Sequence, residues 1–181
     1  MSVSCSLTFG RVRRSVAIVG LGAVSLSSVA ACGASNAATS VEPATSRVEL
    51  TAGDLVASVQ VPKSGKVGEF SALQYTIRNS GAEARGIAVG GCEGPIYARV
   101  ESSAGLRATF RDATRTGACD DIIEVVDIPP GGEVTGASLW KAGTFERGVV
   151  APGQAQVNLE LTASVGGKPV VGSGAAEISV Q

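Results

Sequence analysis

The sequence contains no histidine, and its 181 residues include only seven aromatic residues and one methionine. Histidine is the commonest acid–base residue at neutral pH and the commonest metal ligand, so its absence excludes histidine-based catalytic triads and dyads. A formal net charge of −1 gives no excess of positive charge, which argues against nucleic acid as a partner. Charged residues make up 17% of the chain and hydrophobic residues 44%, a balance typical of a folded protein.

The first 31 residues are organised like an export signal. A positive segment with Arg11, Arg13 and Arg14 precedes an uncharged, mainly apolar stretch over Ser15–Ala31. Because this stretch is diluted with serine and glycine and is shorter than the ~20 apolar residues that span a bilayer, a transmembrane anchor is disfavoured. The sequence therefore predicts a cleaved signal peptide over residues 1–31.

The signal ends in Val29-Ala30-Ala31-Cys32, which resembles the bacterial lipobox. In proteins with that motif the cysteine thiol receives a diacylglyceryl group, and cleavage falls just before the cysteine. The resemblance implies that Cys32 is acylated and that the protein is extracytoplasmic, anchored by lipid to a bacterial membrane. An ordinary secretory peptide with a coincidental cysteine is the alternative. After cleavage, twelve basic and sixteen acidic residues remain, a net charge of −4.

Two cysteines, Cys92 and Cys119, remain once Cys5 is removed with the signal and Cys32 carries lipid. Exported proteins meet an oxidising environment, which predicts a disulfide between them. Closing that loop would contribute about 3–4 kcal/mol on the chain-entropy model. Two unrelated buried thiols are the alternative. A metal site is disfavoured, because two cysteines without histidine would need carboxylates to complete the ligand set.

The mature chain divides into a linker and one domain. Residues 32–45 show no hydrophobic periodicity and are rich in small polar residues, which predicts a flexible linker spanning about 20 Å. Residues 46–181 alternate apolar and polar positions in short runs between glycine- and proline-rich turns. The pattern predicts an all-β domain, an Ig-like antiparallel β-sandwich of about nine strands. The alternation is clearest in Ala155–Ala163, and the Gly166-Gly167 pair after it predicts a tight hairpin. The other predicted strands are Leu55–Val61, Leu73–Asn79, Gly86–Val89, Ile96–Glu101, Leu106–Phe110, Ile122–Ile128, Val134–Trp140, Lys168–Val171 and Ala176–Val180.

A series of strands and turns suggests a family. The strand Leu73–Asn79 is followed by a Pro-Gly turn over 128–133 that leads to Trp140, and then by a second Pro-Gly turn over 148–153. This series resembles the Ig-like domain of the intracellular proteinase inhibitor family first described in bacilli, over about residues 69–163. The shared residues form turns and core, so the resemblance implies a fold more than an activity. Proteinase inhibition is an alternative function, for which the resemblance assigns no inhibitory residue.

The only concentration of acidic residues lies near the middle of the domain. It comprises Asp120, Asp121, Glu124 and Asp127. Clustered carboxylates can hold calcium, but Glu124 and Asp127 would point to opposite faces of a strand, and the spacing does not follow an EF-hand loop. We therefore interpret these residues as a solvated strand edge, with a cation site as the alternative.

The basic and aromatic residues give weaker indications. No Ser-x-x-Lys pattern occurs, and four lysines are predicted to be solvated, most of them in turns: Lys63, Lys66, Lys141 and Lys168. The single tryptophan, Trp140, is predicted to plug one end of the core, with an exposed recognition anchor as the alternative. Arg107 and Arg111 would share one side of a single strand. With Arg99 and Arg115 they are either ordinary solvated residues or a local surface for an anionic cell-wall polymer or lipid headgroup.

Together these patterns predict a lipid-anchored cell-envelope protein with a non-enzymatic binding or scaffolding role. We expect no cofactor and no metal. The expected partners are the membrane, through the N-terminal lipid, and an envelope protein or cell-wall polymer. An extracytoplasmic proteinase inhibitor and a metal-assisted hydrolase are the alternatives from other functional classes.

Overall fold

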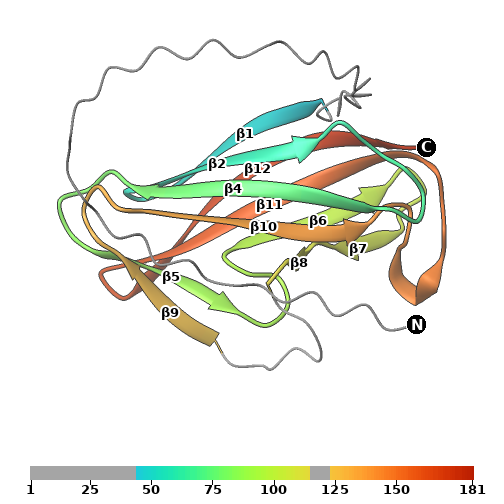
Figure 1. Ribbon diagram of the computed structural model, residues 1–181. Helices are drawn as coiled ribbons and strands as arrows, with labels where there is room; N and C mark the ends of the chain where they lie inside the picture. Colours follow the sequence, from blue (N-terminus) through green and yellow to red (C-terminus); the bar gives the residue numbers. More distant parts are fainter. Residues whose placement is uncertain (1–43, 115–122) are drawn as a thin grey trace, which may run out of the picture. The chain divides into compact units, whose positions relative to one another are not determined.

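A computed structural model describes residues 44–114 and 123–181, which belong to one compact unit of the chain. Two β-sheets pack face to face over this part of the sequence (Figure 1). The only helical segment among the described residues is a short 3-10 turn, Glu146–Gly148. The prediction of an all-β sandwich is therefore confirmed.

The first sheet has five strands in the order β1-β2-β4-β10-β8, all antiparallel to their neighbours. In β4 the odd-numbered residues Leu73, Tyr75 and Ile77 are buried against the second sheet. The even-numbered residues of β4 face outward, as expected for a strand with one solvated face. The strands of this sheet are β1 (Thr45–Ala52), β2 (Leu55–Pro62), β4 (Phe70–Asn79), β10 (Glu133–Lys141) and β8 (Arg111–Asp112).

The second sheet is built around β11, which pairs with strands along both of its edges. β11 and β12, with 13 residues each, are the longest strands of this sheet. One edge of β11 pairs with β12, and the other edge pairs first with β6 and then with β5. Gly166 and Gly167, both with positive φ, form the predicted hairpin turn between β11 and β12. The strands are β3 (Ser64–Gly65), β12 (Lys168–Val180), β11 (Gly153–Val165), β5 (Arg85–Gly90), β9 (Ile123–Ile128), β6 (Ile96–Ser102) and β7 (Arg107–Thr109).

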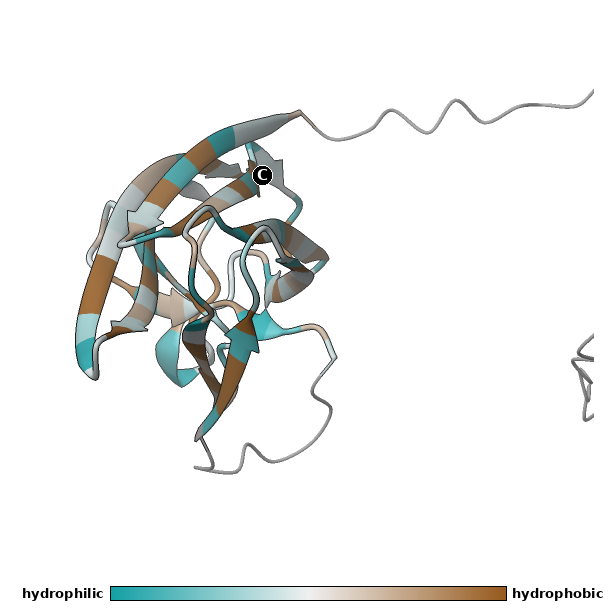
Figure 2. Ribbon diagram, turned by 90° about the vertical axis from the view of Figure 1, so that its left-hand side faces the viewer, coloured by the Kyte–Doolittle hydropathy of each residue, from teal (hydrophilic) through white to brown (hydrophobic). Residues whose placement is uncertain are grey.

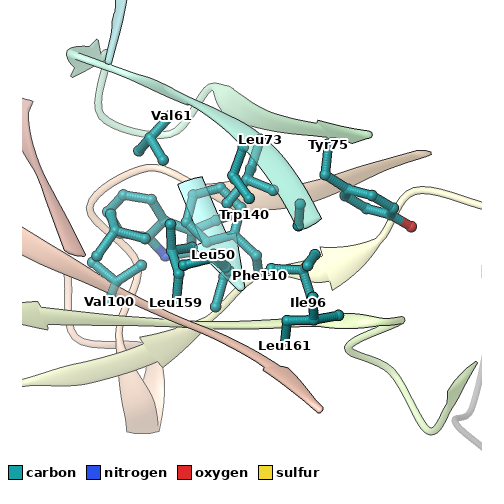
Figure 3. Close-up of a cluster of buried hydrophobic side chains, with 14 of the residues drawn as sticks. Leu50, Val61, Leu73, Tyr75, Ile96, Val100, Phe110, Trp140, Leu159 and Leu161 are labelled. Atoms are coloured by element: carbon teal, nitrogen blue, oxygen red, sulfur yellow. The ribbon is translucent and has the colours of Figure 1, made fainter. Parts of the chain in front are cut away.

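The core lies between the two sheets. Side chains such as Leu73 and Trp140 from the first sheet meet Val100, Leu159 and Leu161 from the second (Figure 3). Apolar and polar residues alternate in bands along the strands (Figure 2), which is the period-two pattern that the sequence predicts. Burying one such aliphatic side chain contributes about 1.5–3 kcal/mol, so the core supplies most of the stability of the domain.

Two sequence predictions at the edges of the domain were wrong in detail. No strand was predicted before Leu55, but β1 begins at Thr45, which had been assigned to the linker, and pairs along its whole length with β2. The two predicted C-terminal segments form one continuous strand, β12. Gly172 and Gly174, between the two predicted segments, lie where β1 approaches β12 closely: a Cβ added at Gly172 would collide with the backbone of Thr51. Gly172 is therefore required by packing and does not interrupt the strand.

The predicted strand Leu106–Phe110 was also wrong. β7 ends at Thr109 and pairs with β6 in the second sheet, whereas β8 begins at Arg111 and pairs with β10 in the first. Phe110, fully buried, lies where the chain crosses between the sheets. The side chain of a residue at such a crossing lies between the two sheets and is buried like that of a core strand residue. The pattern of hydrophobic residues therefore does not reveal that the chain passes from one sheet to the other.

Candidate functional site

The outward face of the first sheet carries one large exposed aromatic side chain. Phe70, the first residue of β4, is 70% exposed and lies opposite Lys141 in the ladder between β4 and β10. Its even number places it on the same face as Gln74 and Thr76. Phe70 is not among the candidate residues predicted from the sequence. Extending the alternation of Leu73, Tyr75 and Ile77 backward by three positions would have placed it on the polar face.

Two hollows flank Phe70. The first, of about 360 Å³, is lined by neutral polar side chains from β1, β2 and β4, among them Thr45, Gln60 and Gln74. An exposed ion pair of 3.0 Å between Lys66 and Glu69 stands at its rim. This hollow therefore offers amide and hydroxyl groups together with an apolar wall formed by Phe70.

The second hollow, of about 510 Å³, lies on the other side of Phe70. Its lining includes Arg111, Asp112, Trp140 and Glu146. The charged lining residues are two cations, Arg111 and Lys141, and two carboxylates, Asp112 and Glu146, so the net charge of the lining is zero. It combines aromatic surface with both signs of charge.

Trp140 belongs to the core. Its indole Nε1 donates a 2.7 Å hydrogen bond to the carbonyl oxygen of Thr144, and its ring lies between Phe110 and Phe145 at centroid distances of 5.8 and 5.7 Å. Only 4% of Trp140 is exposed. The prediction that it plugs the core is confirmed, and the alternative of an exposed recognition anchor was wrong. The exposed aromatic residue at this end of the sandwich is Phe70.

Arg107 and Arg111 do not share one face of a single strand, although the sequence predicts that they do. Arg107 and Arg111 are both exposed, but they lie on β7 and β8 in different sheets, so the prediction of a shared strand face was wrong. Arg99 on β6 is half-buried, with its guanidinium 5.9 Å from the centre of the Tyr97 ring. Arg115 lies outside the described residues.

The acidic and lysine residues agree with the sequence interpretation where the structure describes them. Glu124 and Asp127 are exposed on β9, while Asp120 and Asp121 lie outside the described residues. Within residues 44–114 and 123–181, no three cysteine or carboxylate side chains come together as a metal site requires. The predicted solvated lysines are all exposed: Lys63, Lys66, Lys141 and Lys168.

Of the three cysteines with predicted roles, only Cys92 is among the described residues. It lies in the turn that follows β5, and its carbonyl oxygen accepts a 2.7 Å hydrogen bond from the backbone N–H of Asp112. Cys32 and Cys119 lie outside the described residues, as does the predicted signal peptide over 1–31. The pairing of Cys92 with Cys119 and the acylation of Cys32 stay predictions. In the described part of the chain, no helix is long and apolar enough to cross a membrane.

Comparisons with known proteins assign no family to this chain. No family model and no curated protein matches the sequence. Among solved structures, a β-glucosidase from Listeria innocua is similar over 70% of this chain and 16% of its own, at 16% identity and a TM-score of 0.41. A β-glucosidase from Erythrobacter marinus is similar over 76% of this chain and 16% of its own, at 14% identity and a TM-score of 0.39.

An alkylpurine DNA glycosylase from Pseudomonas fluorescens, bound to DNA containing an abasic-site analogue, is similar over 68% of this chain. That match spans 28% of the glycosylase, at 14% identity and a TM-score of 0.39. This chain thus spans only a small part of each of these enzymes. Similarity this distant supports no inference about activity.

Proposed function

We propose that this chain is a lipid-anchored protein of a bacterial cell envelope, with a non-enzymatic binding role. The order of positive segment, apolar stretch and Val-Ala-Ala-Cys box supports a cleaved signal and an acyl group on Cys32. The folded domain begins with β1 at Thr45, thirteen positions after Cys32. A linker of that length holds the domain within about 20 Å of the headgroups.

The observation that favours binding is the exposure of Phe70 between two hollows. A large aromatic side chain left in water at a rigid strand end is a surface suited to contact, because covering it removes apolar area from solvent. Rigid strands carry Phe70 and its neighbours Gln60, Gln74 and Lys141, so little ordering is needed on contact. We therefore assign the binding role to this end of the sandwich.

A disulfide between Cys92 and Cys119 fits the register of the second sheet. Gly90 lies opposite Ile123 in the ladder between β5 and β9. Cys92 follows Gly90 by two positions and Cys119 precedes Ile123 by four, so both cysteines leave the same end of this ladder. Four residues reach at most about 14 Å, a span that permits a bond between the two thiols. We propose that this disulfide joins the segment before β9 to the turn after β5.

The test of the anchor is the distribution of the protein between membrane and soluble fractions of its own cells. The Cys32→Ser variant is expected to lose the acyl group and to remain unprocessed or leave the membrane as a protein without lipid label. Cys5→Ser is the matched control, because it removes a cysteine that the signal peptide carries outside the box. Equal incorporation of labelled fatty acid into wild type and Cys32→Ser would contradict the proposal.

A further inference from the structure

We propose that the end of the sandwich where β1 begins docks directly on the surface of a bilayer containing anionic headgroups. This end, here called the Thr45 end, comprises the connections 63–69 and 142–152 and the strand ends beside them. This proposal rests on the proposed lipid anchor, and it identifies the membrane surface as the binding partner of the surface around Phe70.

The connections of the Thr45 end lie at the same end of the sandwich (Figure 1), and backbone hydrogen bonds join them. The backbone N–H of Lys63 donates to the carbonyl oxygen of Ala44 at 2.8 Å, which fixes the start of the chain's folded part to the end of β2. Ala142 joins the other connection to this one, since its N–H donates to Glu69 at 2.8 Å and its oxygen accepts from Gly68 at 3.0 Å. The strand that leads back to Cys32 therefore starts on this end.

Exposed apolar side chains gather at the Thr45 end. The described residues include six large exposed hydrophobic side chains, and three of them, Phe70, Val149 and Val150, lie here. Phe70 lines the same hollow as Thr144 and Phe145. Val150 forms a β-bridge with Thr144, and the oxygen of Val149 accepts a 2.9 Å hydrogen bond from Phe145. Apolar side chains presented at loop and strand ends are the kind that enter the headgroup region of a bilayer.

The charge of the Thr45 end is opposite to that of the mature chain. On the connections 63–69 and 142–152 and at the adjoining end of β10, the exposed cations are Lys63, Lys66, Lys141 and Arg147, and the exposed carboxylates are Glu69 and Glu146. This local excess of two positive charges contrasts with a net charge of −4 for residues 32–181. The charges therefore orient the domain with this end toward an anionic surface, to which each nearby lysine or arginine adds attraction.

A tethered domain needs only weak affinity to dock in this way. The twelve residues between Cys32 and Thr45 confine the Thr45 end to about 20 Å from the headgroups, which raises its effective concentration at the surface. The two acyl chains of a diacylglyceryl group hold the chain at the membrane by themselves. The Thr45 end, with its exposed apolar and basic residues, therefore has only to orient the domain against the surface.

The other exposed apolar residues provide a matched control. Val171 lies near the start of β12, close to the turn with β11, whereas the far end of β12 pairs with β3 at the Thr45 end. Val125 and Val126 lie on β9 beside the acidic Glu124 and Asp127. An apolar side chain of similar exposure at position 171 is therefore expected to stay in water while the Thr45 end meets lipid.

The experiment reads the depth of one side chain in the membrane. Full-length protein purified from membranes carries either Phe70→Trp or Val171→Trp and is reconstituted into vesicles of phosphatidylglycerol and phosphatidylcholine with brominated acyl chains. Trp140 is buried and contributes the same background to both variants. We expect strong quenching and a blue shift for Phe70→Trp, no additional quenching for Val171→Trp, and loss of the effect in the Phe70→Trp protein that also carries Lys66→Glu and Lys141→Glu.

Equal quenching of the two variants, or none in either, would overturn the docking proposal. A blue shift of Phe70→Trp that occurs in whole envelopes but not in pure lipid vesicles would also overturn it and would point to a protein or polymer as the occupant. Co-sedimentation with the vesicles is recorded separately and reports the acyl anchor. Co-sedimentation without quenching refutes the docking alone, whereas failure to co-sediment contradicts the proposed function.

Discussion

The side-chain amide of Asn79 donates a 2.9 Å hydrogen bond to the carbonyl oxygen of Ile128, although the two residues lie on different sheets. The same amide donates to the carbonyl oxygen of Glu83 at 2.7 Å, and its Oδ1 accepts from the N–H of Gly81 at 2.9 Å. The backbone of Asn79 also exchanges hydrogen bonds with the turn at 131–132. This fully buried residue thereby joins the end of β4 to the connection between β9 and β10.

The Asn79→Asp variant is expected to lose about 2–4 kcal/mol of unfolding free energy. The substitution replaces a donor of two hydrogen bonds by an oxygen that faces two carbonyl oxygens, and buried polar groups left unsatisfied are costly. Urea denaturation followed by fluorescence of Trp140 measures the change. Asn158→Asp, on a half-buried position of β11, is the control; a loss for Asn79→Asp no greater than for this control would refute the role assigned to Asn79.

The pair Arg85–Asp54 joins the turn between β1 and β2 to β5 in the other sheet. Nε and Nη2 of Arg85 both donate to Oδ2 of Asp54, at 2.9 and 2.6 Å, and Nη1 lies 2.8 Å from Glu83. Asp54→Asn is expected to lower the urea midpoint more than Glu83→Gln. Glu83 is largely exposed, so water screens its attraction to Arg85 and the pair contributes little to stability. Equal midpoints for the two variants would contradict this ranking.

Stability at high pH is expected to depend on Tyr75. Burial, with a smaller contribution from the charge of Asp112, raises the pKa of the Tyr75 hydroxyl to about 12. Below pH ~10 tyrosine is protonated in both the folded and unfolded states, whereas above it the unfolded chain ionises first. Unfolding is therefore increasingly favoured between pH 10 and pH 12, by on the order of 1–2 kcal/mol.

The Tyr75→Phe variant removes this ionisation and should show a flatter loss of stability over the same range. Denaturant midpoints of wild type and Tyr75→Phe at about pH 9, 10, 11 and 12 measure the effect, with Tyr97→Phe as the control. If wild type and Tyr75→Phe lose stability in parallel, the hydroxyl of Tyr75 is not the group responsible.

Gly172 tests the close approach of β1 to β12. A methyl group at this position meets the backbone of Thr51, so Gly172→Ala is expected to cost about 1–3 kcal/mol. Ser173→Ala is the matched control, because Ser173 is exposed on the next position of the same strand. Differential scanning calorimetry of both variants gives the comparison, and an unchanged melting temperature for Gly172→Ala would show that β1 moves aside without penalty.

The sequence predicted the strands that have one solvated face. Ala155–Ala163 and Leu73–Asn79 follow strict alternation, and both lie in the long ladders of the two sheets. β1 was not predicted as a strand at all, and Thr45 and Ser46 at its start resemble the small polar residues of the preceding linker. Their strand conformation comes from pairing with Pro62 and Val61, which lie far from them in the sequence.

The candidate site was less predictable than the fold. A phenylalanine is usually a core residue, and Phe70 lies before the predicted strand Leu73–Asn79, although the alternation of that strand, extended backward, places it on the outward face. Its position opposite Lys141 depends on the register of β4 against β10, which the sequence does not show. The connections 63–69 and 142–152 lie side by side because backbone hydrogen bonds join them, and residues so far apart in the sequence give no local pattern that predicts this contact. The buried state of Trp140, in contrast, followed from its place at the end of a core strand.

The lipid anchor and the disulfide are both tested by the intact mass of the protein purified from membranes, measured before and after reduction and alkylation. We expect a mass for residues 32–181 plus acyl chains, with two alkylated thiols that appear only after reduction. A mass that retains residues 1–31 and carries no acyl chain would contradict the lipid anchor, and alkylation of both thiols without reduction would contradict the disulfide between Cys92 and Cys119.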